Sequence, residues 1–155
     1  MANGEYYNGN YIPENKKKCL NLTILKSNPV FRSGYERKFF YWLDHNDNVK
    51  RWGSEIIKVP YIFLVDRRQH LYYIDIYCEI LGKDGKLKKY LIEIKPSSQT
   101  VAPKRPKIKN KKAYKRFIYE VKRYIQNKNK WRAARAFANK NGLEFKIITE
   151  KDLGI

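Results

Sequence analysis

Tyr72-Tyr73-Ile74-Asp75-Ile76 and Leu91-Ile92-Glu93-Ile94-Lys95-Pro96 are the two stretches of sequence that decide the fold. Both alternate and are rich in β-branched and aromatic residues, which is typical of strands. Each also places charged residues among apolar ones, where an unpaired charge would cost free energy. Two converging carboxylates can hold a divalent cation, and a neighbouring lysine suits chemistry on an anionic phosphodiester. The two stretches therefore predict a β-hairpin that carries a site.

The register of this hairpin follows from its isoleucines, because a slip of one residue would turn them all to the other face. The pairing that keeps them together is Ile74 with Ile94 and Ile76 with Ile92. It places Asp75 opposite Glu93, with Cβ atoms about 5 Å apart, where two like charges repel. It also needs a turn of odd length, centred on Asp84. A bound cation would relieve the repulsion; the alternative is a surface cluster held by an internal salt bridge.

Further elements surround the hairpin in an order typical of an α/β protein. The patterns predict a helix from Ser33, a strand over 55–65, hairpin strands over 71–81 and 87–95, helical segments over 111–126 and 130–140, and a strand over 144–149. Prolines exclude a regular element over 96–112. We expect a mixed central sheet of about four strands flanked by helices, in the order αβββαβ. Residues 1–29 are expected to form a basic, polar extension, and residues 30–155 the domain.

Glu36 has two interpretations. Ser33 and Glu36 have the spacing of a capping box, in which the glutamate reaches back to the start of its own helix. Glu36 also shares the inward face of the helix with Phe40 and Leu43, which would aim its carboxylate at a site. The sequence leaves both interpretations open.

The chain is strongly cationic, with 34 Lys and Arg against 15 Asp and Glu and a formal net charge of +19. Such an excess indicates a polyanionic partner, and nucleic acid is the leading class because basic side chains displace its counterions. No apolar run is long enough to span a bilayer, so we expect no membrane partner. The two cysteines give neither a disulfide framework nor a zinc spacing.

The charge is concentrated over residues 104–132, which contain 13 Lys or Arg and one acid, Glu120. On the helix predicted over 111–126, these cations lie away from a stripe of apolar residues. The imbalance leaves too few acids for ion pairs within the helix, which favours a surface that follows phosphates. The expected nucleic-acid contacts are Lys104, Arg105, Lys107, Lys109, Lys111, Lys112, Lys115, Lys122 and Lys130. No base-reading motif is present.

The order of these features resembles the PD-(D/E)xK nuclease superfamily over about residues 30–150: Glu36 on a helix, Asp75 on a strand, and Glu93-Ile94-Lys95 on the next. Ile74 stands where that motif often has proline. Other segments are similar to the head completion nucleases of T-even-type tailed phages and to the endonuclease subunit of heteromeric bacterial transposases. They are Arg32-Ser33-Gly34-Tyr35-Glu36, Trp52-Gly53-Ser54-Glu55, Val59-Pro60-Tyr61, Lys130-Trp131-Arg132-Ala133-Ala134 and Ile148-Thr149-Glu150.

The resemblance implies a restriction-endonuclease-like fold and Mg²⁺-dependent hydrolysis of double-stranded DNA, with Mn²⁺ able to substitute. Asp75 and Glu93 would hold the metal with the carbonyl of Ile94, and Glu36 would complete the acidic set. Lys95 would orient the attacking water or stabilise charge in the transition state. Glu55 would be an auxiliary carboxylate, and Lys130 would contact phosphate.

The resemblance also implies phage head or portal proteins as further partners, and a location in the host cytoplasm, the virion or both. Two other functions remain open from the sequence. One is a strand-cleaving subunit of a transposase-like complex, and the other is a non-catalytic DNA-binding protein of the phage head.

Overall fold

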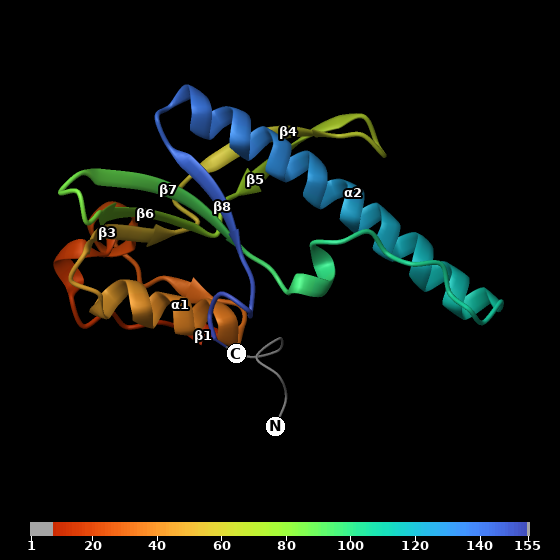
Figure 1. Ribbon diagram of the computed structural model, residues 1–155, viewed down its shortest axis with the longest axis horizontal. Helices are drawn as coiled ribbons and strands as arrows, with labels where there is room; N and C mark the ends of the chain where they lie inside the picture. The colour runs from red at the N-terminus through yellow and green to blue at the C-terminus, as the bar shows by residue number, and fades with distance from the viewer. Residues whose placement is uncertain (1–7, 155) are drawn as a thin grey trace.

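The computed structural model describes residues 8–154, and its body is a four-stranded mixed sheet between two helices (Figure 1). The strands lie in the order β3 (Val49–Ser54), β6 (Ile76–Leu81), β7 (Leu87–Ile94) and β8 (Glu144–Ile148). β6 is antiparallel to both β3 and β7, and β8 is parallel to β7. The predicted α/β class and the four-stranded mixed sheet are confirmed.

The helices cover opposite faces of this sheet. Alternation along β7 sends Leu91 and Ile92 to opposite sides. Ile92 packs in a cluster with Phe40 of α1 (Gly34–His45), while Leu91 packs with Trp131 of α2 (Lys111–Lys140). The sheet therefore has a hydrophobic core on each face. No helix within residues 8–154 combines the length and apolar character that crossing a membrane requires.

The β6–β7 hairpin has the predicted register over the length of β6, with Ile76 opposite Ile92 and a connecting loop over 82–86. The strand predicted over 71–81 is not continuous, however. It breaks at Ile74 and Asp75, which belong to no strand. Ile74 does not pair with Ile94, and it is buried in the cluster of Leu91 rather than that of Ile76. The predicted ladder pairing of Asp75 with Glu93 is therefore wrong.

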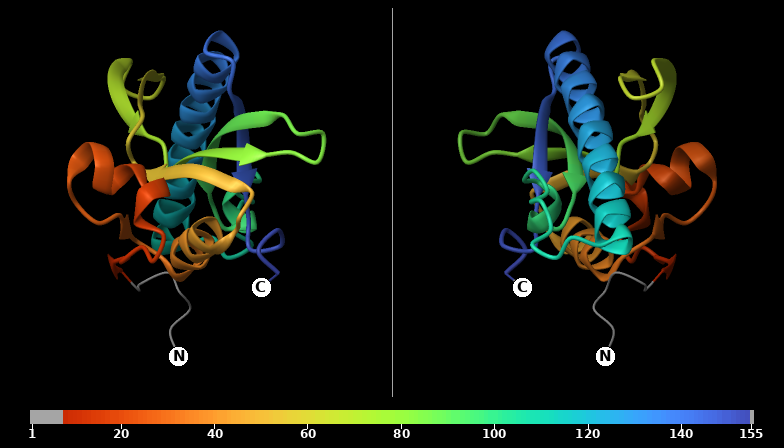
Figure 2. Two further views of the ribbon diagram at one scale, coloured as in Figure 1. Left: turned by 90° about the vertical axis from the view of Figure 1, so that its left-hand side faces the viewer. Right: turned by 90° about the vertical axis from the view of Figure 1, so that its right-hand side faces the viewer.

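The break arises because the residues before Ile74 pair elsewhere. β5 (Arg68–Tyr73) pairs with β4 (Lys58–Phe63) in a separate two-stranded sheet. Figure 2 shows this hairpin standing apart from the four-stranded sheet. The strand predicted over 55–65 thus corresponds to β4 and does not belong to the central sheet. That place is taken by β3, which the sequence did not indicate because a bulge between Val49 and Arg51 interrupts its alternation.

The two helical segments predicted over 111–126 and 130–140 form one helix of 30 residues, α2. Its N-cap is Asn110, whose side-chain oxygen accepts a hydrogen bond from Ala113 N at 2.8 Å. The asparagines between the two predicted segments pack within this helix: Asn127 is buried, and Asn129 accepts a hydrogen bond from Leu64 N at 3.0 Å. The interruption expected between the two segments is therefore absent.

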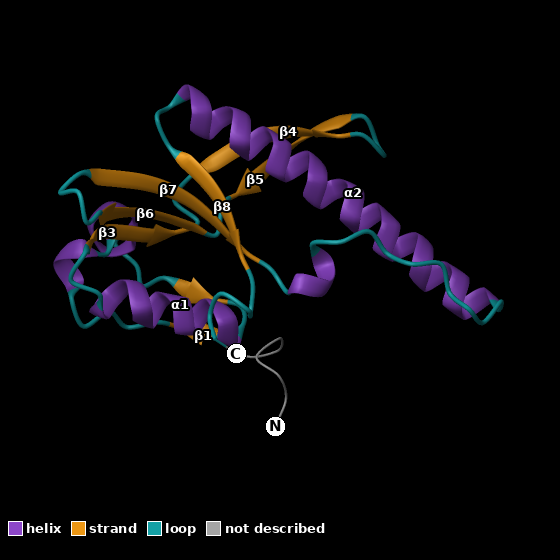
Figure 3. Ribbon diagram, in the orientation of Figure 1, coloured by secondary structure: helices purple, strands orange, loops and turns teal. Residues whose placement is uncertain are grey.

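The first half of α2 projects beyond the sheet, together with the irregular chain that leads into it (Figure 3). Between β7 and α2 the chain has no long regular element, as the prolines predicted, and forms only one short 3₁₀ turn, η4 (Ser97–Gln99). Residues 104–110 then lie along the first turns of the helix, where the two segments line shared hollows. We call residues 101–122 the arm.

Residues 8–29 lie against the body rather than apart from it. β1 (Gly9–Asn10) pairs with β2 (Val30–Phe31), and two short helical turns lie between these strands in the chain, η2 (Lys16–Lys18) and η3 (Asn21–Leu25). Tyr11 and Cys19 are buried in the same cluster as α1. The boundary at residue 29 stays a prediction, and residues 1–7 of the predicted extension lie outside the described residues.

Candidate active site

A cleft of about 640 Å³ lies where the chain breaks between β5 and β6. Its lining comes from the start of α1, the end of β7, the η4 turn and α2. The lining residues are Arg32, Ser33, Tyr35, Glu36, Asp75, Ile94, Lys95, Pro96, Gln99, Arg116 and Arg123. Glu93 is 3% exposed, and its Oε1 is 3.2 Å from Lys95 Nζ. The structure therefore brings the four predicted catalytic side chains to one place.

Asp75 occupies the gap left by the strand break. Its carbonyl oxygen accepts a hydrogen bond from Glu55 N at 3.2 Å, and its Oδ2 accepts one from Ile94 N at 2.8 Å. Burial raises the pKa of the Asp75 carboxyl well above its ordinary value, and the nearby Glu93 and Glu36 carboxylates raise it further. The two carboxylates thus interact although their residues are not ladder partners.

Glu93 is held from both sides. The hydroxyl of Tyr72 donates a hydrogen bond to Glu93 Oε2, and Lys95 lies at Oε1. Burial raises the pKa of Tyr72, and the charge of Glu93 raises it further. The hydroxyl of Tyr72 therefore stays protonated and can donate the hydrogen bond. Lys130 Nζ lies 5.5 Å from the centre of the Tyr72 ring, and burial lowers the pKa of Lys130. Tyr72 fixes the orientation of the glutamate and was not identified from the sequence.

The structure is compatible with both interpretations of Glu36. Ser33 Oγ accepts a hydrogen bond from Glu36 N at 3.1 Å, which caps the helix. The Glu36 carboxylate accepts one from Arg32 N, one residue before the position that a capping box would use. The same carboxylate lines the cleft, and burial raises its pKa. Capping and a place in the site are therefore compatible.

Glu55 lies beside the site but is engaged by an arginine. Arg32 reaches it with two hydrogen bonds, Nε to Oε1 at 3.1 Å and Nη2 to Oε2 at 2.8 Å. Glu55 follows β3 directly and has a left-handed backbone with φ of 55°. Arg32 was not predicted as a site residue, because nothing in its local pattern indicates the partner that β3 brings to it.

The donor set suits a hard divalent cation. Carboxylate oxygens are the ligands that Mg²⁺ prefers, and a cation would relieve the repulsion that raises the pKa of Asp75. Within residues 8–154, no three His, Cys, Asp or Glu side chains are grouped closely enough to hold a metal by themselves. Two close carboxylates fit Mg²⁺, which keeps several waters and seldom occupies a cage made by protein alone.

The predicted nucleic-acid contacts divide between the cleft and the arm. Lys130 lies at the site, whereas the others are exposed on the arm or its loop: Lys104, Arg105, Lys107, Lys109, Lys111, Lys112, Lys115 and Lys122. Arg116 and Arg123, which belong to the cationic face predicted to follow phosphates, both line the cleft. Their spacing of seven residues places them on one helix face.

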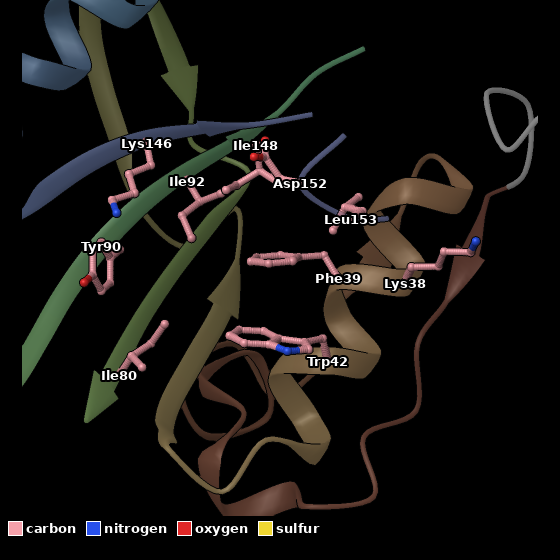
Figure 4. A pocket seen from close by; sticks show the side chains of 10 residues that line it. All are labelled: Lys38, Phe39, Trp42, Ile80, Tyr90, Ile92, Lys146, Ile148, Asp152 and Leu153. Carbon is pink, nitrogen blue, oxygen red and sulfur yellow. The ribbon is translucent and has the colours of Figure 1, made fainter. Parts of the chain in front are cut away.

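A second hollow, of about 520 Å³, lies between α1 and the strands β6 to β8 (Figure 4). Apolar side chains dominate it, among them Phe39, Trp42, Tyr90 and Ile92. It contains none of the predicted catalytic residues. The cleft at Asp75 is therefore the better candidate for the active site.

Comparison with known proteins agrees with this geometry. Residues 46–150, which include Asp75, Glu93 and Lys95, match the family described as TnsA-like endonuclease N terminal. Over 150 residues, covering 95% of this chain and 93% of the relative, the sequence is 35% identical to the head completion nuclease of Enterobacteria phage T4. The chain belongs to the TnsA-like endonuclease family and is homologous to a phage head completion nuclease.

Proposed function

We propose that this protein is a Mg²⁺-dependent endodeoxyribonuclease of the PD-(D/E)xK type, which cuts double-stranded DNA during completion of a phage head. The observation that carries the proposal is the cleft lined by Glu36, Asp75 and Lys95 beside the arginines of α2, with Glu93 in an ion pair with Lys95. The homology to a head completion nuclease supports the biological setting.

Asp75 and Glu93 would hold the ion together with the carbonyl of Ile94. A bound Mg²⁺ would lower the pKa of a water and neutralise charge on the scissile phosphate. The protein fixes the two carboxylates before DNA arrives, since Ile94 N holds Asp75 and the Tyr72 hydroxyl holds Glu93. Such support from surrounding groups is typical of metal sites.

The cations of the site would act on the phosphate. Lys95 lies at Glu93 and at the cleft wall, where its ammonium can orient a water or stabilise charge that develops on the phosphate. Lys130 lies beside Tyr72, where burial lowers the pKa of its ammonium. Contact with a phosphate would stabilise the charged form of Lys130. Arg116 and Arg123 would contact phosphates that flank the cut.

The plasmid assay is the direct test. We expect the purified protein to nick or linearise supercoiled plasmid with Mg²⁺ or Mn²⁺, and to leave it intact with EDTA. Lys95→Gln should slow cutting by about 100-fold, because it removes a charge aimed at the reacting phosphate. Binding of the plasmid in EDTA should change little. Lys88→Gln is the matched control, since Lys88 is an exposed lysine of β7, the strand that Lys95 directly follows.

Cutting in EDTA, or equal rates for Lys95→Gln and Lys88→Gln, would contradict the proposal. Binding without cutting under either metal would favour a non-catalytic DNA-binding protein. The family match also favours one second candidate, a strand-cleaving subunit of a transposase-like complex. That candidate predicts cutting only when a partner protein is added.

A substitution at Glu36 separates its two roles. Glu36→Gln should leave α1 intact, because the amide oxygen can still accept from Arg32 N. It should slow cutting by about tenfold, since it removes one charge from the acidic set around the metal. Ser33→Ala is the control that removes the cap alone. The measurements are thermal unfolding and plasmid cutting, and a Glu36→Gln variant that cuts at the wild-type rate would assign Glu36 to capping only.

A further inference from the structure

The arm carries an apolar hollow surrounded by cations. Its volume is about 650 Å³, and it is lined by Arg105, Pro106, Ile108, Lys109, Asn110, Lys111, Tyr114 and Lys115, none of which is acidic. Ile108 is 70% exposed and Tyr114 is 54% exposed. The lining of the hollow therefore combines accessible aromatic and aliphatic side chains with cations.

This exposure is unexpected from the sequence. The apolar stripe over 111–126 is typical of a helix that packs against a core. Because the first half of α2 projects beyond the sheet (Figure 1), Tyr114 and Ile118 of this stripe stay exposed instead, and Tyr119 is exposed beside them in sequence. Exposed apolar groups gathered on one element mark an interaction surface.

The charges around the hollow decide what it fits. Four cations surround it, namely Arg105, Lys109, Lys111 and Lys115. A second copy of the arm would bring like charges together, which is unfavourable. Duplex DNA would satisfy the cations, but its paired and stacked bases would leave Ile108 and Tyr114 without apolar contacts. Single-stranded DNA offers both phosphates and unstacked bases that lie against aromatic rings.

We propose that this hollow binds unpaired bases of single-stranded DNA, so that the preferred substrate is a duplex with a single-stranded segment next to the cut. The proposal rests on the proposed nuclease function and names its substrate class.

The helix fixes how far Tyr114 in the hollow lies from Arg123 in the cleft. Arg116 and Arg123 line the catalytic cleft, and Arg116 follows Tyr114 by two residues. At 1.5 Å per residue, Tyr114 and Arg123 are about 14 Å apart along the axis of α2. That distance corresponds to about four base steps of one strand. The unpaired segment should therefore begin about four nucleotides from the phosphate at Arg123.

The test measures DNA binding in EDTA by fluorescence anisotropy, with one duplex in two forms, blunt and carrying a single-stranded tail. We expect the wild-type protein to bind the tailed form about tenfold more tightly. Tyr114→Ala should abolish this preference, and Tyr114→Phe should keep it because the ring is retained. Tyr41→Ala is the matched control, since Tyr41 is 59% exposed on α1, outside the arm.

Equal affinities of the wild type for the two forms, or a preference that Tyr114→Ala retains, would overturn the proposal. Self-association that Tyr114→Ala abolishes, without a tail preference, would overturn it in favour of a second copy of the chain. Because binding in EDTA requires no cutting, the result is independent of the plasmid assay. A tail preference in a protein that never cuts would refute the nuclease function while supporting the binding site on the arm.

Discussion

Asp75→Asn is expected to abolish cutting of plasmid DNA, with a loss of about 10³-fold, and to leave the protein more stable than the wild type. The amide keeps the shape of the side chain and can still accept from Ile94 N. It removes, however, one of the two charges that would hold the cation and, through it, the scissile phosphate. Asp47→Asn, at an exposed position after α1, is the control.

The gain in stability follows from the pKa of Asp75. Burial and the neighbouring carboxylates raise that pKa, so the folded protein binds a proton at pH values where the unfolded chain has lost it. The free energy of unfolding therefore falls as pH rises from the pKa of Asp75 in the unfolded chain, about 4, through its raised pKa in the folded protein. Above the folded pKa, the loss of stability stays constant. Asparagine avoids that cost. We expect the free energy of unfolding at neutral pH to rise by about 1 kcal/mol, measured by urea denaturation.

A variant that cuts DNA at the wild-type rate would contradict the role of Asp75. A variant that is inactive but less stable than the wild type would show that its carboxylate is structural.

Asp44→Ala should have the largest effect on stability, lowering the free energy of unfolding by about 3 to 4 kcal/mol. Asp44 is fully buried and joins residues 8–29 to α1. Its carboxylate accepts hydrogen bonds from Tyr11 Oη at 2.8 Å, Glu14 N at 2.9 Å and Asn15 N at 3.0 Å. Alanine would leave these donors without their acceptor and open a void.

The pH dependence of this contribution has the opposite sign to that of Asp75. Burial alone would raise the pKa of Asp44, but the hydrogen bonds from Glu14 N, Asn15 N and the Tyr11 hydroxyl lower it below its ordinary value. The stabilisation is therefore present above the unfolded pKa, about 4, and is lost as pH falls through the folded one. Urea denaturation of Asp44→Ala beside Asp47→Ala measures it. Equal stability of the two variants at neutral pH would contradict this prediction.

The β6–β7 hairpin could be predicted because burial of its isoleucines permits one register. Ile76 pairs with Ile92 as that argument requires. The break at Ile74 could not be predicted in the same way. Residues before and after it alternate equally well, and alternation does not identify the partner of a strand. The continuous α2 was missed for a related reason, since buried Asn127 carries a polar side chain whose tertiary setting is invisible in sequence.

In the candidate site, too, some residues could be predicted from the sequence and others could not. Asp75, Glu93 and Lys95 could be predicted as candidates because charges among apolar residues are costly without a partner, and Glu36 because it shares the inward face of its helix and fits the resemblance. The groups that support them could not. Tyr72, for example, has the sequence pattern of an ordinary strand residue, and only the turn of the chain after β5 carries its hydroxyl to Glu93.

Calorimetric titration of the DNA-free protein with Mn²⁺ tests most directly whether Asp75 and Glu93 form a divalent-cation site. We expect saturable binding by the wild type and by Asp47→Asn, and loss of that binding in both Asp75→Asn and Glu93→Gln. Mn²⁺ binding that is unchanged in both of these variants would contradict the account.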